Sequence, residues 1–548
     1  MHVNAGRSRI ATTHGIVAAS QPLAASAGAQ ILERGGHAVD AAIAANAVLG
    51  VVEPEMNGIG GDLFAIVSNR QGGLWGLNAG GWAPRALTPE RLRVSGLHEM
   101  PFGGIHSVTV PGAVAGWQAL HDRFGRLPLS DVLAPAVSFA THGFPVSDII
   151  AERWAERGAK LTAHPEAARI YLPNGRAPQA GEVFRNPDLA AALSRVGAEG
   201  RDGFYKGPTA DAILSLSRRL RGTLEFDDLE EFTPEWCGLL STTYRGWEVF
   251  ELPPNTQGIA ALMMLDIMER FPLGEYGFHS ARALHVMIEA KKLAYADMLR
   301  YVGDARFGAP PIHDMLSKDS ARARAARIRP DRAASSVEPT RFEGVTNRHG
   351  GDTIYLSVID REGHIVSLIQ SIYDSFGCGL VPEGCGFALH NRGALFTLEE
   401  GHPNVLAPRK RPLHTIIPGF MRKGDVRIGF GIMGAWNQAQ AHAQFVANIA
   451  DFGLDIQEAL EAGRFTKATF DGPDVQIEAL VPEDVRRELV AKEHDVTVVA
   501  PRSGVFGSGQ AVQDDGRGVH FGASEPRHDG AAIPEAPPFR STRVPVAL

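Results

Sequence analysis

The stretch that decides the fold of this chain is Gly350-Gly351-Asp352-Thr353-Ile354-Tyr355-Leu356-Ser357-Val358. The two glycines can take backbone angles that are closed to other residues, so they suit a strained turn. The residues after Thr353 are rich in β-branched and aromatic side chains, which predicts a buried strand. A threonine placed here could attack the carbonyl in front of it, cut the chain and become a new N-terminal residue. Its α-amine would then activate its own hydroxyl for nucleophilic catalysis. Taken alone, the stretch also fits a plain strand that follows a loop.

Motifs on both sides of this stretch favour the catalytic interpretation. After it come Ser371-Ile372-Tyr373-Asp374-Ser375-Phe376-Gly377, His390-Asn391-Arg392-Gly393 and Lys410-Arg411-Pro412-Leu413-His414-Thr415-Ile416-Ile417-Pro418. Before it come Gly35-Gly36-His37-Ala38-Val39-Asp40-Ala41-Ala42, Val51-Val52-Glu53-Pro54, Gly58-Ile59-Gly60-Gly61 and Val110-Pro111-Gly112-Ala113-Val114-Ala115-Gly116. In this order and spacing the motifs resemble the γ-glutamyltransferase family, a branch of the N-terminal nucleophile (Ntn) hydrolases. The resemblance covers nearly the whole chain.

The resemblance implies a fold and a processing event. The expected fold is α+β, a four-layer αββα sandwich of the Ntn-hydrolase type with helical additions. Self-cleavage between Asp352 and Thr353 would give a large subunit, residues 1–352, and a small subunit, residues 353–548, that remain one integrated fold. The resemblance implies no cofactor and no metal ion. His390, His414 and His442 likewise lack metal-ligand spacing, and no HExxH or CxxC pair accompanies them.

The resemblance also assigns catalytic residues. Thr353 is expected to be the nucleophile in processing and in turnover. Ser371 matches a family threonine whose hydroxyl steadies the nucleophile, and we favour this role over the alternative of a strand serine bonded to its neighbours. Gly434 matches the first glycine of the family's oxyanion pair, and Ala435 replaces the second. Backbone N–H groups in such a turn can stabilise a tetrahedral oxyanion.

The expected substrate pocket departs from the family pattern. Gly80 stands where the family has an arginine for the glutamyl carboxylate, and Leu395 stands where it has an aspartate for the glutamyl ammonium. Tyr373 replaces a family asparagine. His414 replaces the first serine of a serine pair and leaves Thr415 as the second hydroxyl. These changes predict weakened recognition of a glutamyl zwitterion, because burying an unpaired charge is unfavourable.

The candidate substrate-binding residues are therefore Tyr373, Arg392, His414 and Thr415. Arg392 has two interpretations at this stage. It could bind an anionic substrate in place of the missing arginine, or it could be a structural ion-pair partner.

Composition narrows the class of protein. The chain has 548 residues, 44% of them hydrophobic and 21% charged, with a net charge of −8 and mixed signs along its length. This gives no basic stripe for nucleic acid. The N-terminus lacks an apolar region, and no apolar run of about eighteen residues follows, so no membrane span is expected. Three cysteines without CxxC spacing fit a reducing compartment. We expect a cytoplasmic protein, and an oligomer is compatible with the sequence.

Periodicity predicts the elements around the motifs. Helices are expected at residues 22–34, 39–51, 113–124, 129–142, 281–301 and 439–452. Strands are expected at 63–67, 74–77, 353–359 and 365–369, with a β-rich segment up to residue 522. The polar segment 332–349 is expected to be a surface linker, which suits a site that must be cut.

Three functions are compatible with these features. The leading one is a self-processing γ-glutamyltransferase-like enzyme that cleaves γ-glutamyl compounds such as glutathione through an ester of Thr353. The first alternative keeps the fold and cleaves a small amide or an acyl amide, as in oxamate-cleaving and β-lactam side-chain-cleaving relatives. The second alternative is an unprocessed binding protein without activity. The partners expected are a small-molecule amide and the two subunits of one precursor.

Overall fold

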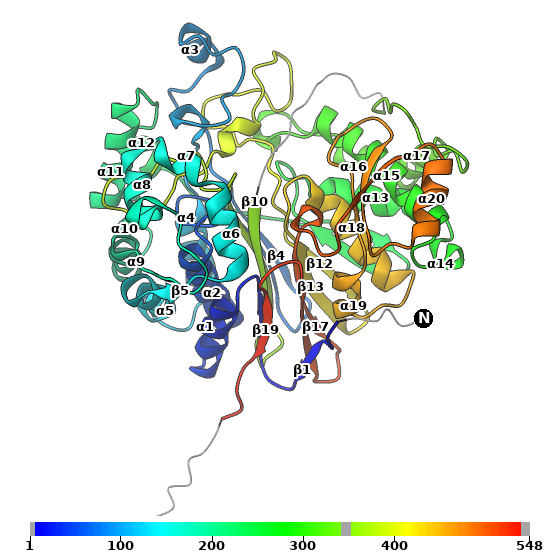
Figure 1. The fold of residues 1–548 in the computed structure, drawn as a ribbon, viewed down its shortest axis with the longest axis horizontal. Helices are drawn as coiled ribbons and strands as arrows, with labels where there is room; N and C mark the ends of the chain where they lie inside the picture. The colour runs from blue at the N-terminus through cyan, green and yellow to red at the C-terminus, as the bar shows by residue number, and fades with distance from the viewer. Residues whose placement is uncertain (1–5, 341–351, 539–548) are drawn as a thin grey trace, which may run out of the picture.

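The computed structural model describes residues 6–340 and 352–538. Two β-sheets face each other in its centre, and helices cover the outer face of each sheet (Figure 1). This order of layers confirms the predicted α+β four-layer sandwich. The diglycine Gly350-Gly351 lies outside the described residues.

The first sheet combines strands from both sides of the expected cleavage point. The hairpin of β10 and β11 lies between β2 and β3, and all of these pairings are antiparallel. In spatial order the strands are β19 (Ala531–Pro534), β2 (Ile16–Ala19), β10 (Asp352–Ile359), β11 (Ile365–Tyr373), β3 (Asp62–Ser68), β4 (Leu74–Ala79) and β7 (Glu235–Cys237). The two expected subunits therefore interleave within one sheet.

The second sheet interleaves the same two parts of the chain. Its strands, in spatial order, are β1 (Ile10–Thr12), β18 (His520–Ser524), β17 (Gly509–Asp514), β13 (Val426–Ile432), β12 (Gly419–Lys423), β9 (Trp247–Glu251) and β8 (Leu240–Tyr244). It packs face to face on the first sheet, where the Ser357 hydroxyl of β10 donates to the carbonyl of Gly429 in β13 at 3.3 Å. Smaller sheets join β14 (Phe465–Thr466), β15 (Asp474–Glu478) and β16 (Asp495–Val499), and β5 (Phe144–Pro145) with β6 (Val183–Phe184).

Helices form the two outer layers. Those packed on the first sheet are α1 (Pro22–Glu33), α2 (Ala38–Val52) and α4 (Ala113–Phe124). Those packed on the second sheet are α13 (Gly258–Met268), α18 (Asn437–Ala450) and α19 (Ile456–Glu461). Further helices extend both layers, among them α3 (Pro89–Val94), α5 (Leu129–His142), α9 (Pro187–Glu199), α11 (Gly207–Arg219), α15 (Ala281–Tyr301), α17 (Lys318–Ala325) and α20 (Glu483–Ala491). These are the expected helical additions.

Local sequence signals explain why the helices begin and end where they do. In α1, the Gln21 side chain accepts from the N–H of Leu23 and Pro22 opens the helix. In α2, His37 and Asp40 form a capping box. The Ala-rich faces of α1 and α2 let the two helices pack closely. Each predicted helix is present, with ends that agree within two residues.

Strand β11 is longer than predicted. It runs to Tyr373, beyond the predicted end at residue 369, so it carries Ser371. The part of the expected linker that is described, residues 332–340, is tied to the protein: the N–H of Ala333 donates to the carbonyl of Lys492 at 2.7 Å, and the N–H of Thr340 to Asp297 Oδ1 at 2.6 Å. Residues 341–349 lie outside the described residues.

No helix of the described chain is long and apolar enough to cross a membrane, and the compartment stays a prediction.

Several histidines of the described residues are buried in the fold in their neutral form. Burial lowers the pKa of His37 to about 4 and the pKa of His414, His494 and His528 to about 3. In the unfolded chain a histidine titrates near pH 6.5. The unfolded state therefore binds protons first as the pH falls, and acid favours unfolding.

We expect the free energy of unfolding to be greatest above about pH 6.5 and to fall as the pH drops toward 4, because each such histidine removes up to about 1.4 kcal/mol per pH unit. Denaturant titrations at several pH values measure this slope. His528→Gln, which keeps a donor for the Ser20 carbonyl, should make the slope shallower. A stability that does not change between pH 7 and pH 4.5 would contradict the expectation.

Candidate active site

Thr353 lies at a β-bulge at the start of β10. Asp352 pairs with Tyr373 and Ile354 pairs with Gln370, so the register shifts between the two pairs. Ser371 and Ile372 on β11 therefore lie opposite the single residue Thr353. Thr353 is 1% exposed and Ser371 is fully buried. The bulge thus brings the two predicted hydroxyl residues to the same place in the sheet.

The N-terminus of α18, a helix that packs on the second sheet, lies next to Thr353. Gln438, in the first turn of the helix, donates from Nε2 to Thr353 Oγ1 at 3.4 Å. The turn before the helix contains Gly434 with φ 119° and Ala435 with φ 52°. This region is open to glycine and strained for alanine. The first N–H groups of a helix have no acceptor within it and carry partial positive charge, so this end suits a developing oxyanion.

Gln257 holds the turn of Gly434 and Ala435 in place through hydrogen bonds. Its Nε2 donates to the carbonyl of Ala435 at 2.7 Å and also to the carbonyl of Thr415. Gln438 in turn accepts from the N–H of Ile417 at 3.0 Å. The segment that holds Thr415 and the turn that holds Ala435 are therefore connected through buried glutamines.

A buried carboxylate, Asp62, organises the opposite side of the site. Its Oδ1 accepts from the N–H of Gly81 at 2.8 Å, and its Oδ2 lies 3.0 Å from His414 Nε2. The same Oδ2 lies 3.5 Å from His390 Nδ1 and 3.9 Å from Arg392 Nε. All four of these side chains are fully buried. One carboxylate thus faces a guanidinium and two imidazoles.

Arg392 links this cluster to the residue beside the nucleophile. Its Nη2 donates to Ser371 Oγ at 2.9 Å and its Nη1 to Thr415 Oγ1 at 2.8 Å. Its guanidinium carbon lies 4.4 Å from the centre of the Tyr373 ring. Ser371 Oγ also accepts from the N–H of Tyr373 at 2.8 Å. The geometry therefore gives Arg392 the contacts of an internal ion-pair and positioning residue.

The charges of this cluster follow from its burial. Burial pushes the pKa of Asp62 upward, but His390, His414 and Arg392 outweigh it and lower the pKa to about 2. Burial and the neighbouring Arg392 lower the pKa of His414 to about 3. Burial also lowers the pKa of Arg392, to about 10. At neutral pH the cluster holds a carboxylate and a guanidinium, with His414 neutral.

Gly80, the position of the missing family arginine, lies against this cluster. A Cβ there would lie 3.0 Å from the Phe64 ring and 3.5 Å from the His414 ring. Arg411 reaches the same place from another segment: its Nε donates to the carbonyl of Gly80 at 2.9 Å, and its Nη1 pairs with Glu235 at 2.6 Å. The charge of Arg411 is therefore already balanced inside the protein.

The structure brings the predicted site residues together and adds others. Thr353, Ser371, Tyr373, Arg392, Thr415 and His414 form one connected set, with Gly434 and Ala435 at the nearby helix terminus. Sequence reasoning missed Asp62, Gln257 and Gln438. Asp62 directly follows the Gly58-Ile59-Gly60-Gly61 motif, and an acid at the start of an otherwise apolar strand was the available signal.

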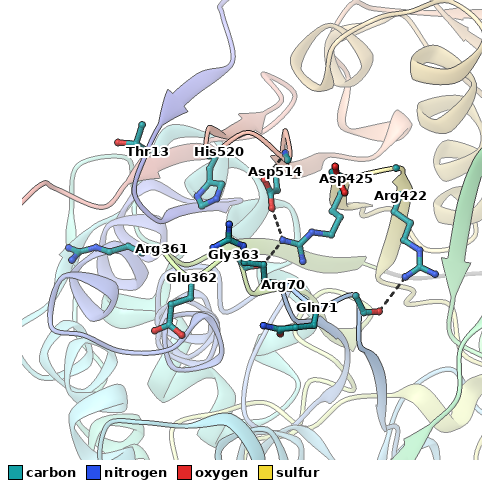
Figure 2. A pocket seen from close by; sticks show the side chains of 15 residues that line it. Thr13, Arg70, Gln71, Arg361, Glu362, Gly363, Arg422, Asp425, Asp514 and His520 are labelled. Atoms are coloured by element: carbon teal, nitrogen blue, oxygen red, sulfur yellow. Dashed lines mark hydrogen bonds and ion pairs between the residues drawn. The ribbon is translucent and has the colours of Figure 1, made fainter.

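A polar cavity of about 640 Å³ lies elsewhere, at the opposite end of the strands (Figure 2). It is formed by the turns that hold Arg70, Arg361, Asp425 and Asp514. Arg361 lies past the end of β10, roughly 27 Å from Thr353 at about 3.4 Å per strand residue. This cavity is therefore separate from the candidate site.

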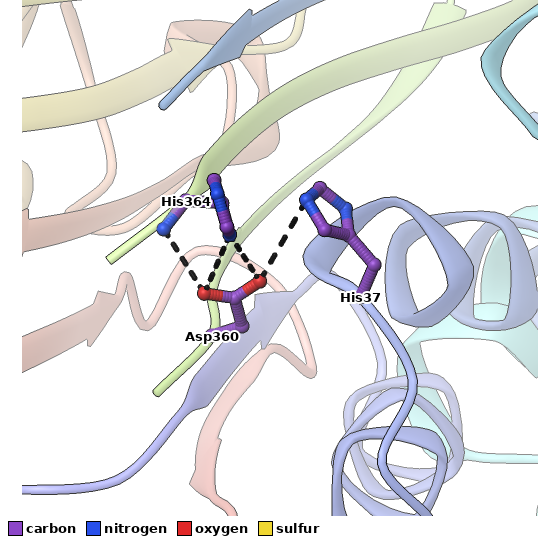
Figure 3. Close-up of side chains that lie close together, drawn as sticks. All are labelled: His37, Asp360 and His364. Atoms are coloured by element: carbon purple, nitrogen blue, oxygen red, sulfur yellow. Dashed lines mark hydrogen bonds and ion pairs between the residues drawn. The ribbon is translucent and has the colours of Figure 1, made fainter. Parts of the chain in front are cut away.

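Within the described residues, two groups of side chains could be considered as metal ligands, His37 with Asp360 and His364, and His285 with Glu289 and His494. In the first group (Figure 3), His37 Nδ1 accepts from the N–H of Val39 at 3.0 Å, so Nε2 carries the proton and faces Asp360 at 3.9 Å. Binding a metal through Nε2 would move that proton to Nδ1, against the Val39 N–H. This group instead joins the start of α2 to the β10–β11 turn.

The second group is also engaged internally. His285 Nδ1 and His494 Nε2 share a hydrogen bond of 2.8 Å. The Glu289 carboxylate accepts from Lys292 at 2.7 Å and from the N–H of Ala334 at 3.2 Å. Neither group offers an open set of ligands, and neither contacts the candidate site.

Comparison with known proteins gives consistent relatives. The family model described as Gamma-glutamyltranspeptidase matches residues 24–535. A glutathione hydrolase-like YwrD proenzyme of Bacillus subtilis is 33% identical, over 95% of this chain and 98% of the relative. An oxamate amidohydrolase proenzyme of Klebsiella pneumoniae is 32% identical, over 95% of this chain and 98% of the relative. The crystal structure of a cephalosporin acylase from Bacillus halodurans is 38% identical, covers 97% of this chain and 98% of that chain, and has a TM-score of 0.91.

The Asp62 cluster predicts a sharp response to loss of one charge. Asp62→Asn should lower the free energy of unfolding by about 3 to 5 kcal/mol, because it leaves the buried Arg392 without its anion. Urea denaturation measures the change. Asp211→Asn, at an exposed aspartate, is the matched control and should change stability by less than about 0.5 kcal/mol. Equal stability of the two variants would show that the cluster does not depend on the Asp62 charge.

Proposed function

The chain belongs to the gamma-glutamyltranspeptidase family, and from this premise we propose that Thr353 is the nucleophile of its reaction. Membership makes the chain an amide-cleaving enzyme of the Ntn-hydrolase class that is made as a proenzyme. The observation that supports Thr353 most directly is the contact of its Oγ1 with Gln438 Nε2 at 3.4 Å, beside the turn of Gly434 and Ala435.

The first reaction is cleavage of the precursor. Thr353 Oγ1 attacks the carbonyl carbon of residue 352, and the peptide C–N bond breaks as an ester C–O bond forms. The proton of the hydroxyl passes to the nitrogen of Thr353, which becomes a free α-amine. Water then hydrolyses the ester. The products are residues 1–352 and residues 353–548, which remain together because their strands interleave in both sheets.

The second reaction is cleavage of the substrate amide. The α-amine of Thr353 accepts the hydroxyl proton while Oγ1 attacks the carbonyl carbon of the amide, and the same proton then goes to the leaving amine. N–H groups around Gly434 and Ala435 stabilise the oxyanion. Water as acceptor gives hydrolysis of the acyl ester, and an amine as acceptor gives transfer.

The surrounding residues act on position and charge. Ser371 and Gln438 hold the Thr353 hydroxyl in place. Arg392, tied to Ser371 and Thr415, keeps Ser371 oriented and contributes positive charge beside the reacting atoms. Arg392 and Tyr373 thus position Ser371 beside the nucleophile, and His414 is a hydrogen-bond partner of Asp62.

We further propose that the acyl group is not a γ-glutamyl group, so that the small-amide or acyl-amide alternative describes this enzyme better. Leu395 offers no anion to an ammonium group. Arg411 is paired with Glu235 and Arg392 faces Asp62, while Arg85 is half-exposed and paired with Glu231 at 3.0 Å. A glutamyl zwitterion would therefore bring both charges to a site whose nearby cations already have partners.

Self-cleavage tests the role of Thr353. Divided in proportion to length, the 58.8 kDa chain should give fragments of about 38 kDa and about 21 kDa, the second beginning at Thr353. A denaturing gel with N-terminal sequencing checks this. Thr353→Ala should stay full length, and Thr353→Ser, which keeps a hydroxyl, should still cut. A wild-type chain that stays intact through long incubation would refute the proposal and favour a binding protein without activity.

Kinetics on γ-glutamyl-p-nitroanilide test the acyl preference. We expect its kcat/KM to be at least about a hundredfold below that of the best uncharged acyl anilide, because the glutamyl charges would lack partners. The measurement uses processed enzyme, checked on a gel, with both substrates in one buffer. Equal turnover of the two would mean that other residues bind the glutamyl charges.

A further inference from the structure

A second cavity, of about 380 Å³, lies beside the segments that carry Arg392 and Thr415. Its lining comes from several separate parts of the chain. These are His98, Glu99 and Met100 after α3, Leu299 near the end of α15, residues 394–399 with His402 and Asn404, and Leu413. We propose that this cavity receives an apolar acyl group of the substrate, a linear chain of several methylene groups. The proposal rests on the function proposed above and specifies its substrate class.

The cavity is linked by one turn of helix to Arg392, the partner of Ser371. Arg392, which donates to Ser371, and Leu395, which lines the cavity, are the ends of a 3₁₀ turn (Arg392–Leu395). Side chains three residues apart in a 3₁₀-helix lie one above the other, with a rise of about 6 Å. Leu413 likewise lines the cavity and is two residues from Thr415, the other partner of Arg392. A group bound between Leu395 and Leu413 therefore lies directly beyond the residues that hold Ser371.

The inner walls combine apolar side chains with two buried polar ones, His402 and Asn404, that are hydrogen-bonded within the protein. Leu299, Leu395, Phe396 and Leu413 are each 9% exposed or less. The charged residues that line the cavity, Glu99 and Glu399, are exposed and stand at its rim. An ammonium or carboxylate group would lose its water at the inner walls without gaining a partner. Methylene groups would gain from burial there.

The walls are held in place before any substrate binds. The Asn404 side chain donates from Nδ2 to the carbonyl of Leu395 at 2.6 Å and accepts from the N–H of Leu413 at 2.7 Å. It thereby fixes the two leucines relative to each other. A preformed apolar cavity binds without the entropy loss of ordering its walls.

The acyl side of the substrate suits this cavity better than the amine side. In the proposed reaction the acyl group stays bonded to Thr353 Oγ1 after the amine has left. A cavity whose walls are fixed by Asn404 fits the part that remains through both steps. The departing amine needs a path to solvent.

A series of p-nitroanilides with acetyl, butyryl, hexanoyl and octanoyl groups tests this on processed wild-type enzyme. We expect kcat/KM to rise about fourfold for each added methylene until the cavity is filled. A second series, hexanoyl amides of small and large amines, should vary much less.

Two variants on the same segment locate the effect. Met100→Trp fills the cavity from its partly exposed side, and the ratio of hexanoyl to acetyl kcat/KM should fall about tenfold or more. Val94→Trp is the matched control, because Val94 is 90% exposed on α3 and outside the lining. Its ratio should equal that of wild type.

The outcomes separate the two proposals. Turnover that does not change with acyl length, or a Met100→Trp ratio equal to that of Val94→Trp, would overturn the acyl cavity while leaving amide cleavage by Thr353 intact. Turnover that follows the amine and not the acyl group would overturn it as well. A processed enzyme that cleaves no anilide of either series would overturn the proposed function and this inference with it.

Discussion

The carboxylate of Asp62 is the group on which the candidate site depends. It stands at the first position of β3, fully buried, and it faces His390, His414 and Arg392. A buried charge without partners is strongly unfavourable, so the carboxylate and the guanidinium stabilise each other only as a set. Through Arg392 the same set reaches Ser371, beside Thr353. The position of the proposed nucleophile is thus linked to an ion cluster that never contacts solvent.

This dependence links residues that are far apart in the sequence. Arg392 and His414 lie on two separate segments, more than twenty residues apart. In the fold both segments converge on Asp62. Neither Asp62 nor Arg392 could be exchanged alone without leaving a buried charge unbalanced, and loss of His414 would remove a hydrogen-bond partner of Asp62. With its donors engaged by Ser371 and Thr415, Arg392 leaves the walls at Leu395 without charge, and the chemistry of the acyl pocket follows from that.

Much of this could be predicted from the sequence, for physical reasons that can be named. Helices α4, α5 and α15 begin and end at the predicted residues because apolar periodicity and end signals are local. Thr353 and Ser371 could be placed together because one short turn joins β10 to β11. Asp62, Gln257 and Gln438 could not, since they meet Thr353 and Arg392 only when two sheets pack and distant segments come together. A glutamine in the first turn of a helix looks like a solvated residue until its helix is docked.

The strands of the two subunits interleave within both sheets, and this changes how the chain can refold after it is cut. In the precursor, β2 and β10 are parts of one chain, so the effective concentration of each strand near the other is high. After the cut, β10 and β11 still fill the space between β2 and β3, but the covalent tie is gone. Should the halves ever separate, each would expose unpaired strand edges, and reassembly would require two molecules to meet. The precursor folds as a single chain, whereas separated subunits would have to associate before they could refold. The lifetime of the mature enzyme is therefore set by the rate at which its two subunits dissociate.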